Sequence, residues 1–251
     1  MTTLFLFAHQ DDEFGVFWKI QSLRQQGQRV AVAYLTAGTF SGEPSPIRDQ
    51  ESIRVLGLIG VPINDINFVG NRAGIPDGHL PEYLQIAFDH CVELAYEIGN
   101  ISEICCLAWE GGHQDHDAVH LIGVQLAKKL DVFDQSCQFP LYNGAGLRGV
   151  FFRLFSPLPS NGAVFITKIP IKARLRFATL PFYYRSQWRT WCGLYPFMLL
   201  HYIFSAKQYL QKLSVERIKS TVHSGQLLYE RRGFYSAQMF AYYAKKFIAN
   251  V

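Results

Sequence analysis

The sequence predicts an α/β protein: a Rossmann-like, three-layer domain in which helices cover both faces of a mostly parallel β-sheet. Short apolar runs alternate with segments of helical length through the first 130 residues, which is the pattern of βαβ units. Apolar residues make up 49% of the 251 residues and charged residues 18%. This composition supports a sizeable buried core and excludes a disordered chain, a collagen-like repeat and a coiled coil.

Four segments are expected to be β-strands. Residues 3–8 are an apolar run that stops abruptly at His9, and residues 29–35 are rich in β-branched side chains. The third and fourth strands are expected at residues 66–69 and 104–109. Because the carboxyl ends of parallel strands meet at one edge of a sheet, the polar residues that follow these strands should share that edge.

Helices are expected between the strands. The apolar spacing predicts them at residues 14–26, 47–58, 81–98 and 117–130, with Gly27 ending the first. Strands separated by helices of this length lie parallel, with the helices packed on both faces of the sheet.

The pattern becomes less regular after about residue 140. Residues 157–162 are rich in proline, serine and glycine, short β-like runs follow, and helical segments are expected from residue 195 onward. With no repeat and no low-complexity linker, we expect a single domain over residues 1–251. It would consist of a core at residues 1–140 and a basic, aromatic C-terminal elaboration at residues 141–251.

Charge is distributed unevenly along the chain. Residues 1–150 contain 9 Lys/Arg and 18 Asp/Glu, a net charge of −9, whereas residues 151–251 contain 15 and 2, a net charge of +13. The basic part could bind a phosphate-bearing ligand or a membrane surface, or simply dock against the acidic part. No helix-turn-helix, RNA-recognition or zinc-finger signature is visible, so nucleic acid is not an expected partner.

Cysteine usage and hydropathy predict a soluble, cytoplasmic protein. The five cysteines show no CxxC pattern and are expected to be buried thiols in a reducing compartment. The N-terminus has no basic region of a signal peptide. The longest uncharged stretch, residues 190–206, is too short to span a bilayer. Residues 191–204 could either pack against the core or lie on a membrane surface as an amphipathic segment.

Two clusters of polar residues contain the candidate metal-binding and catalytic side chains. HQDDE at residues 9–13 follows the first strand, and HQDH at residues 113–116 follows the fourth, with His120 one helical turn beyond His116. Imidazole and carboxylate groups are good zinc ligands, and a catalytic zinc keeps three protein ligands. One acid of a tandem pair can bind the metal while its neighbour acts as a base toward the bound water. His120 could support His116 or complete the ligand set.

These clusters resemble the motifs of a known family. AHQDDE (residues 8–13) and GGHQDH (residues 111–116) resemble AHPDDE and HPDH of the LmbE-like (PIG-L) zinc-dependent N-acetylglucosaminyl deacetylases. The resemblance covers roughly residues 3–130, and it includes TAG at 36–38, GE at 42–43, RDQE at 48–51, LG at 56–57 and PDGHL at 76–80. YRSQ at residues 184–187 looks like a more distant match to the same family.

The resemblance implies one zinc ion per chain, although another divalent transition metal could take its place. His9, Asp12 and His116 are the implied ligands, and Asp11 is the implied general base that takes a proton from the zinc-bound water. We assign Glu13 to support of the loop rather than to chemistry.

Three further roles follow from the same resemblance. His113 would stabilise the tetrahedral oxyanion and help to protonate the departing amine, and Asp115 would orient His113 and hold it cationic. Arg48 would contact the substrate. An amide needs this combination of Lewis acid, activated water, oxyanion donors and leaving-group protonation because its carbonyl is a poor electrophile.

Two positions depart from the family pattern. Gln10 and Gln114 replace the proline that is usual at the second position of each motif. Glutamine restores backbone freedom and adds an amide that could reach the metal. Every implied ligand and the base are present, so we expect activity to survive.

The sequence therefore predicts a metal-dependent hydrolase that removes the N-acetyl group from an N-acetylated amino sugar by attack of a metal-bound water. The sugar could be free or linked to a nucleotide, a lipid or a glycan. Two alternatives stay open: a deacylase of another amide, such as a secondary metabolite, and a non-catalytic binding protein on the same fold. The oligomeric state is left open.

Overall fold

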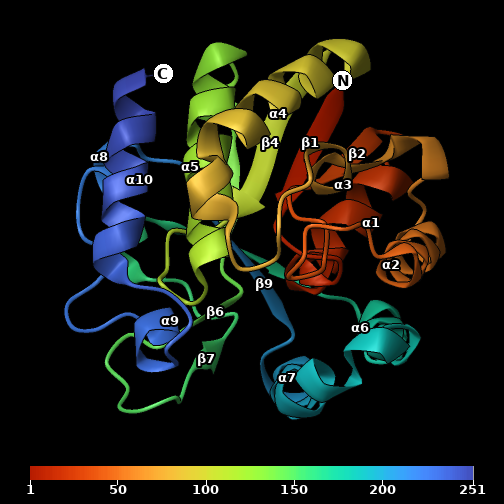
Figure 1. Ribbon diagram of the computed structural model, residues 1–251. Helices are drawn as coiled ribbons and strands as arrows, with labels where there is room; N and C mark the ends of the chain where they lie inside the picture. The colour runs from red at the N-terminus through yellow and green to blue at the C-terminus, as the bar shows by residue number, and fades with distance from the viewer. Residues whose placement is uncertain (251) are drawn as a thin grey trace.

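A seven-stranded β-sheet forms the centre of the computed structural model, which describes residues 1–250 (Figure 1). The strand order is β3-β2-β1-β4-β5-β9-β8. The strands are β1 (Thr2–Phe7), β2 (Arg29–Tyr34), β3 (Ile66–Phe68), β4 (Ile101–Leu107), β5 (Cys137–Phe139), β8 (Val164–Lys168) and β9 (Lys207–Lys212). Pairing is parallel from β3 to β5 and antiparallel at β5–β9 and β9–β8. The expected α/β fold with a mostly parallel sheet is confirmed.

Helices cover both faces of the sheet. They are α1 (Phe17–Gln25), α2 (Pro46–Leu58), α3 (Val69–Ala73), α4 (Leu84–Ile98), α5 (Gln114–Lys129), α6 (Ile171–Phe177), α7 (Trp188–Leu200), α8 (Val215–Ile218), α9 (Leu228–Arg231) and α10 (Ala237–Asn250). The chain moves outward from β1 in one direction through β2 and β3, and in the other through β4 and β5. Right-handed crossovers therefore place α1 and α2 on one face and α4 and α5 on the other (Figure 1).

The core lies on either side of β1. Residues 4–7 of this strand are fully buried because β2 and β4 flank it and helices cover it from both sides. Phe7 contacts Tyr34 of β2 and Phe139 of β5 through its ring. This continuous apolar packing holds the carboxyl end of β1 rigidly, and the first polar motif begins there.

Sequence patterns located the strands of the first 110 residues to within two or three positions, but placed some helix ends less well. The segment expected to be one helix at residues 14–26 is a 3₁₀ turn, η1 (Asp12–Gly15), followed by α1. The helix expected from residue 117 begins at Gln114. Cys192 is exposed, whereas the other four cysteines are buried as expected.

The C-terminal hundred residues add to the same sheet. β8 and β9 extend its edge, and the short pair β6 (Tyr142–Asn143) and β7 (Arg153–Leu154) lies beside the site. α7 continues into a π-helical turn, η8 (His201–Ser205). The division into core and elaboration stays a prediction, although the sheet runs across the proposed boundary.

The apolar segment at residues 191–204 has two faces. Trp191, Met198 and Tyr202 pack into the core, while Leu200 and Phe204 are exposed. Among residues 1–250, no helix is long and apolar enough to cross a membrane. The packing face is thus observed, and the outward face is free to contact another surface.

Candidate active site

Both polar motifs lie at the same edge of the sheet, as expected. β1 and β4 are neighbouring parallel strands, and the loop after β1 carries His9 and Asp12, while the loop after β4 leads to His113 and His116 at the start of α5. This edge is the point where the strand order reverses direction, which is where ligands bind in open α/β sheets. Segments about a hundred positions apart in sequence are therefore in contact.

Three of the predicted site residues form a close group, the donor triangle, to which Asp12 contributes both of its carboxylate oxygens. His116 Nε2 lies 3.2 Å from Asp12 Oδ1 and 3.3 Å from His9 Nδ1. His9 Nδ1 lies 3.5 Å from Asp12 Oδ2. A tetrahedral zinc with bonds of about 2.0–2.1 Å keeps its ligand atoms about 3.3–3.4 Å apart. His116 Nε2 lies close to that spacing from both His9 Nδ1 and Asp12 Oδ1, and imidazole and carboxylate groups suit such an ion.

The backbone fixes Asp12 in this triangle. Its Oδ2 accepts hydrogen bonds from the backbone N–H groups of Ala8 and His9, at 2.9 and 2.8 Å. Burial alone would raise the pKa of Asp12, but the facing His116 and His9 outweigh it and lower that pKa well below its usual range. Asp12 is thus a rigid, ionised carboxylate with its second oxygen directed at His116.

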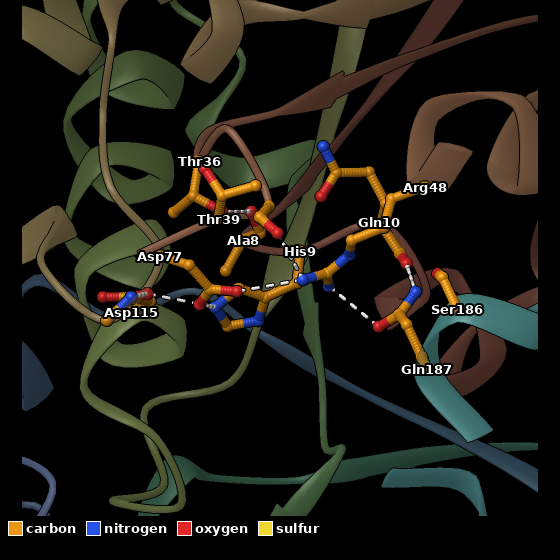
Figure 2. A network of polar contacts seen from close by, with 12 residues as sticks. Ala8, His9, Gln10, Thr36, Thr39, Arg48, Asp77, Asp115, Ser186 and Gln187 are labelled. Carbon is orange, nitrogen blue, oxygen red and sulfur yellow. Dashed lines mark hydrogen bonds and ion pairs between the residues drawn. The ribbon is translucent and has the colours of Figure 1, made fainter. Parts of the chain in front are cut away.

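The second ring nitrogen of His9 faces two carboxylates. His9 Nε2 lies 2.9 Å from Asp77 Oδ1 and 3.0 Å from Asp115 Oδ2, as Figure 2 shows. Metal-bound histidines commonly donate their other N–H to a carboxylate, which fixes the ring and its tautomer. A ring nitrogen of His113 also lies within 4.8 Å of nitrogens of His9 and His116, so His113 is the alternative third ligand.

Asp11 contrasts with its neighbour Asp12. Its carboxylate lines the cleft and has no hydrogen-bond partner among residues 1–250. Burial and then the charge of Asp12 raise the pKa of Asp11 well above its usual value. Asp12 therefore has the fixed, ionised carboxylate of a metal ligand, whereas the carboxylate of Asp11 is free to accept a proton.

Asp115 and His113 are not arranged as expected. The carboxylate of Asp115 accepts the backbone N–H groups of Gly78 and Leu80, at 2.6 and 3.0 Å, and lies 4.0 Å from His113 Nδ1. That Nδ1 instead accepts the backbone N–H of Asp115 at 3.2 Å. Burial lowers the pKa of His113 to about 3. Asp115 therefore ties the 78–80 loop and His9 to α5, and His113 is a neutral ring whose proton is on Nε2.

Arg48 lies in the cleft but is held by protein groups. Its Nη1 donates to the carbonyl of Gly38 and to Asp77 Oδ2, at 2.8 and 3.0 Å, and its Nη2 donates to Gln187 Oε1 at 2.8 Å. Sequence analysis included Asp77 and Gln187 only as members of the PDGHL and YRSQ stretches and gave neither residue a role. Their signal was present in the quoted PDGHL and YRSQ stretches, but their contacts with Arg48 were not foreseeable.

The two glutamines that replace family prolines hydrogen-bond through their amide nitrogens to groups outside the donor triangle. Gln10 Nε2 donates to Asp49 Oδ1 at 3.0 Å, and Gln114 Nε2 donates to the carbonyl of Gly78 at 2.9 Å. Their amide oxygens, which are the atoms that could bind a metal ion, have no hydrogen-bond partner among residues 1–250, so the idea that they reach the metal stays a prediction. Gln10 ties the first motif to α2, and Gln114 ties the second motif to the 78–80 loop.

His120 and Glu13 lie outside the donor triangle. His120 Nδ1 donates to the carbonyl of Leu107 at 2.9 Å, and its ring packs on Trp109, so His120 does not complete the ligand set. Glu13 is buried and accepts the hydroxyl proton of Tyr184 at 2.6 Å. Burial raises the pKa of Glu13 to about 7. Its contact to Tyr184 links the first motif to the C-terminal part, in keeping with a supporting role.

The triangle opens into a cleft of about 1090 Å³. The catalytic candidates form its floor, and the C-terminal part contributes much of its wall. Large apolar side chains and three arginines line it: Phe14, Phe40, Ile47, Tyr142, Phe152, Trp188, Leu194, Phe234, Arg48, Arg189 and Arg232. The site therefore combines a polar, buried floor with an apolar and cationic mouth.

Comparison with known proteins agrees with this arrangement. The family model described as PIG-L, GlcNAc-PI de-N-acetylase, matches residues 4–127. No match was found among curated proteins. Several solved structures share the fold.

One of these structures is a deacetylase–bog complex from teicoplanin biosynthesis, with a TM-score of 0.62 and 16% identity, covering 84% of this chain and 98% of that chain. A second is the zinc-inhibited form of teicoplanin deacetylase Orf2, with a TM-score of 0.60, 14% identity and coverage of 84% and 98%. A third is N,N'-diacetylchitobiose deacetylase from Pyrococcus horikoshii, with a TM-score of 0.55, 18% identity and coverage of 84% and 82%. At these identities the likeness shows the fold, whereas the family match rests on residues 4–127. Residues 4–127 of the chain therefore form a domain that matches the PIG-L, GlcNAc-PI de-N-acetylase family.

Proposed function

We propose that this chain is a zinc-dependent N-deacetylase that hydrolyses the acetamide of an N-acetylated amino sugar. The observation that carries the proposal is the donor triangle of His9, Asp12 and His116, which lies beside the unpartnered carboxylate of Asp11 on the floor of the cleft. A non-catalytic binding protein would not need a free carboxylate next to a complete set of metal donors.

His9, Asp12 and His116 would hold the metal ion, for which zinc fits the donor set best. When bound, zinc lowers the pKa of coordinated water and polarises a carbonyl oxygen. The side chains in contact with His9 and Asp12 keep this set in place before the ion arrives. They include the carboxylates of Asp77 and Asp115, which can accept a hydrogen bond from Nε2 of His9.

Asp11 would act as the general base. Asp12 is unsuited to that role because two backbone N–H groups and His116 occupy its oxygens. Asp11 has no such partners and faces the cleft, so it can take a proton from the attacking water and return it to the departing amine nitrogen. The C–N bond then breaks with a neutral amine as the leaving group.

His113 would hold the carbonyl oxygen of the substrate. Because its Nδ1 accepts a backbone N–H, the proton of the neutral ring is on Nε2 and is available as a donor. A donor that is fixed before the reaction stabilises the negative charge on that oxygen as the tetrahedral intermediate forms. Asp115 would act by positioning His9 and the 78–80 loop, not by charging His113.

The cleft favours a substrate larger than a free monosaccharide. Aromatic rings at its mouth, including Trp188 and Phe234, can pack against an apolar carrier or a sugar face, and Arg189 and Arg232 can pair with a phosphate. Arg48 would contact the substrate from the cleft wall. We therefore propose a nucleotide-, lipid- or glycan-linked sugar as the substrate. A lipid carrier would be consistent with contact between the exposed face of α7 and a membrane surface.

The same apolar mouth favours one second candidate, a deacylase of another amide such as an acylated secondary metabolite. The metal ion, the general base and the oxyanion donor would act on such an amide as they would on an N-acetylated sugar. The two candidates differ in what fills the mouth of the cleft.

The experiment measures bound metal by elemental analysis and then acetate release. The substrates are N-acetylglucosamine in free, uridine-diphosphate-linked and lipid-linked forms, together with an N-acetylated amine without a sugar. The proposal predicts about one zinc per chain and turnover of a linked sugar. Asp11→Asn should keep the zinc and lose at least a hundredfold in kcat. Unchanged turnover in Asp11→Asn would contradict the base assignment, and turnover of the sugar-free amine alone would favour the second candidate.

A further inference from the structure

The outward face of α7 and η8 is an exposed apolar surface beside the catalytic cleft. Trp191, Met198 and Tyr202 pack into the core, so the opposite side of the helix faces solvent. The exposed residues between 191 and 204 are Cys192, Gly193, Pro196, Phe197, Leu200, Ile203 and Phe204. Contiguous apolar surface is uncommon on soluble monomers and marks a place of interaction.

The large side chains of this surface lie in one row. Phe197, Leu200 and Phe204 follow one another at intervals of three and four residues, the spacing of a single helix face. Together with Ile203 they are 48%, 50%, 81% and 57% exposed, in that order. We call these four residues the α7 stripe.

The α7 stripe offers no side chain that can form a hydrogen bond. Interfaces between proteins usually carry about one hydrogen bond per 100–200 Å². An apolar helix face without such groups is better suited to the non-directional surface of a lipid bilayer. Because α7 has 13 residues, fewer than the roughly 20 needed to span a bilayer, it would lie on that surface.

Positive charge lies at both ends of the stripe. Arg185 and Arg189 are exposed at the start of α7. At the other end, the backbone N–H of Ile169 donates to the carbonyl of Ala206, directly after η8, at 2.8 Å. This bond brings the exposed Lys168 beside the end of the stripe.

Helix α6 adds positive charge next to η8. Arg174 Nη1 donates to the carbonyl of Tyr202 at 3.2 Å, and Lys172 on the same helix is exposed. In Figure 1, α6 and α7 lie at the end of the molecule opposite to both termini. Residues 135–215 contain ten Lys/Arg and no Asp/Glu. An apolar stripe flanked by cations, in a segment without acids, complements the negative charge of an anionic bilayer.

A second copy of this chain fits the stripe less well. In a two-fold dimer the same patch meets itself, so a contact between two stripes would bring their flanking cations together. Like charges that face each other across an interface oppose association. The charges around the stripe therefore favour an anionic lipid surface over self-association.

The stripe is continuous with the mouth of the catalytic cleft. Trp188, Arg189 and Leu194, on the first two turns of α7, line the cleft. Phe197 of the stripe packs on Phe152, another lining residue, with ring centroids 5.3 Å apart. A surface that covers the stripe would therefore lie at the rim of the cleft.

We propose that the α7 stripe and its flanking cations dock this protein on an anionic lipid bilayer. The apolar side chains would enter the boundary between head groups and acyl chains, and the Lys and Arg side chains would pair with lipid phosphates. Docking needs neither a substrate nor turnover. Its failure and a failure of the deacetylase proposal can therefore be told apart.

The test sediments the metal-loaded full chain with two kinds of vesicle. One kind is phosphatidylcholine alone, and the other is phosphatidylcholine and phosphatidylglycerol in equal parts. Binding to the mixed vesicles should be about tenfold tighter or more. It should weaken as salt is added, because salt screens the surface charges.

Two pairs of glutamate substitutions test the stripe. Leu200→Glu with Phe204→Glu should weaken binding to the mixed vesicles about tenfold or more, because the new charges would have to leave water. Ile86→Glu with Tyr96→Glu adds the same two charges at exposed apolar positions of α4. This control should bind like wild type, and circular dichroism shows whether both variants are folded.

Two pairs of glutamine substitutions test the cations. Lys168→Gln with Lys172→Gln should weaken binding about fivefold or more, since each cation near an anionic surface adds to the affinity. Lys128→Gln with Lys129→Gln removes the same charge at the exposed end of α5 and should leave binding unchanged.

A fluorescence measurement tests which face enters the bilayer. With brominated phosphatidylcholine in the mixed vesicles, Phe204→Trp should add a quenched signal to that of wild type, whereas the extra signal of Tyr96→Trp should not be quenched. Equal binding to both kinds of vesicle, equal loss in the two glutamate pairs or in the two glutamine pairs, or equal quenching would overturn the proposal. A wild-type dimer that dissociates in the Leu200→Glu, Phe204→Glu variant would also overturn it, by assigning the stripe to a contact between copies.

Discussion

Arg48 Nη2 donates a hydrogen bond of 2.8 Å to Gln187 Oε1, across 139 residues of sequence. The amide nitrogen of Gln187 also donates to the backbone carbonyl of Gln10, within the first motif. One glutamine therefore joins Arg48 to the motif loop. Gln187 lies beyond residues 4–127, which match the family model, so the C-terminal part helps to build the site.

Gln187→Ala should lower kcat/KM about tenfold and leave the zinc content unchanged. The substitution removes a hydrogen bond to a charged group, worth about 1.5–3 kcal/mol, and frees Arg48 to move. Most of the loss should appear as a higher KM, because Arg48 is proposed to contact the substrate. Steady-state kinetics with the best linked substrate and elemental analysis measure the two effects.

The matched control is Gln135→Ala, which removes an exposed glutamine outside the cleft. It should leave both kinetic constants within twofold of wild type. If Gln187→Ala behaves like this control, the contact with Arg48 has no part in substrate binding.

The zinc content of two variants should show whether Asp12 or His113 is the third metal ligand. Asp12→Ala should lose at least nine-tenths of the bound zinc, because its oxygens are 3.2 and 3.5 Å from the nitrogens of His116 and His9. His113→Ala should keep the zinc and lose activity. The measurement is elemental analysis after dialysis, with circular dichroism to show that both variants are folded. The opposite result would make the three histidines the ligand set.

Much of this site could be predicted because its determinants are local in sequence. The apolar run of β1 ends where His9 begins, and parallel strands deliver their carboxyl ends to one edge. The start of α5 was placed three residues late because its cap is unusual. His113, rather than a serine or an aspartate, accepts the backbone N–H of Asp115 and starts the helix there.

The parts that escaped prediction depend on contacts between distant segments. Asp77 belongs to a turn, and only packing against α5 brings it to His9. β9 enters the sheet between β5 and β8 although its buried residues include Gln208 and Gln211, so hydropathy gives little signal. The amide nitrogen of Gln211 donates there to the carbonyls of Leu158 and Gly162, whereas its Oε1 has no partner among residues 1–250.

Gln114→Pro should be nearly neutral for stability, whereas Gln114→Ala should cost about 1 kcal/mol. Gln114 is the first residue of α5, a position where proline fits the backbone and needs no N–H. Both variants lose the hydrogen bond to Gly78, worth about 0.5–1.5 kcal/mol. Proline recovers about 0.4–1 kcal/mol by restricting the unfolded chain.

Urea unfolding of the two variants, compared with wild type at the same zinc concentration, measures the difference. A proline variant less stable than the alanine variant would show that this turn of α5 does not accept the fixed backbone angle of proline. The family's usual residue would then be incompatible with this loop.

His120 should make the protein less stable as the pH falls below 6.5. Its ring is fully buried between Trp109 and the carbonyl of Leu107, and its Nε2 has no partner among residues 1–250. Burial lowers the pKa of His120 from 6.5 to about 4. Between these values the unfolded chain binds a proton at this position and the folded chain does not, so protonation favours unfolding.

The loss should reach about 3 kcal/mol at pH 4 and develop between pH 6.5 and 4, since each unit of pKa shift corresponds to about 1.4 kcal/mol. His120→Asn introduces an amide whose Nδ2 can donate to the carbonyl of Leu107 in place of the imidazole Nδ1, and this amide does not titrate. The difference in unfolding free energy between wild type and this variant should therefore change with pH. The contributions of the other titratable groups are the same in both proteins and cancel in this difference. His79→Asn, at an exposed histidine, controls for the loss of an imidazole. A difference that stays constant from pH 7 to pH 4 would mean that His120 is protonated equally readily in the folded and unfolded chain.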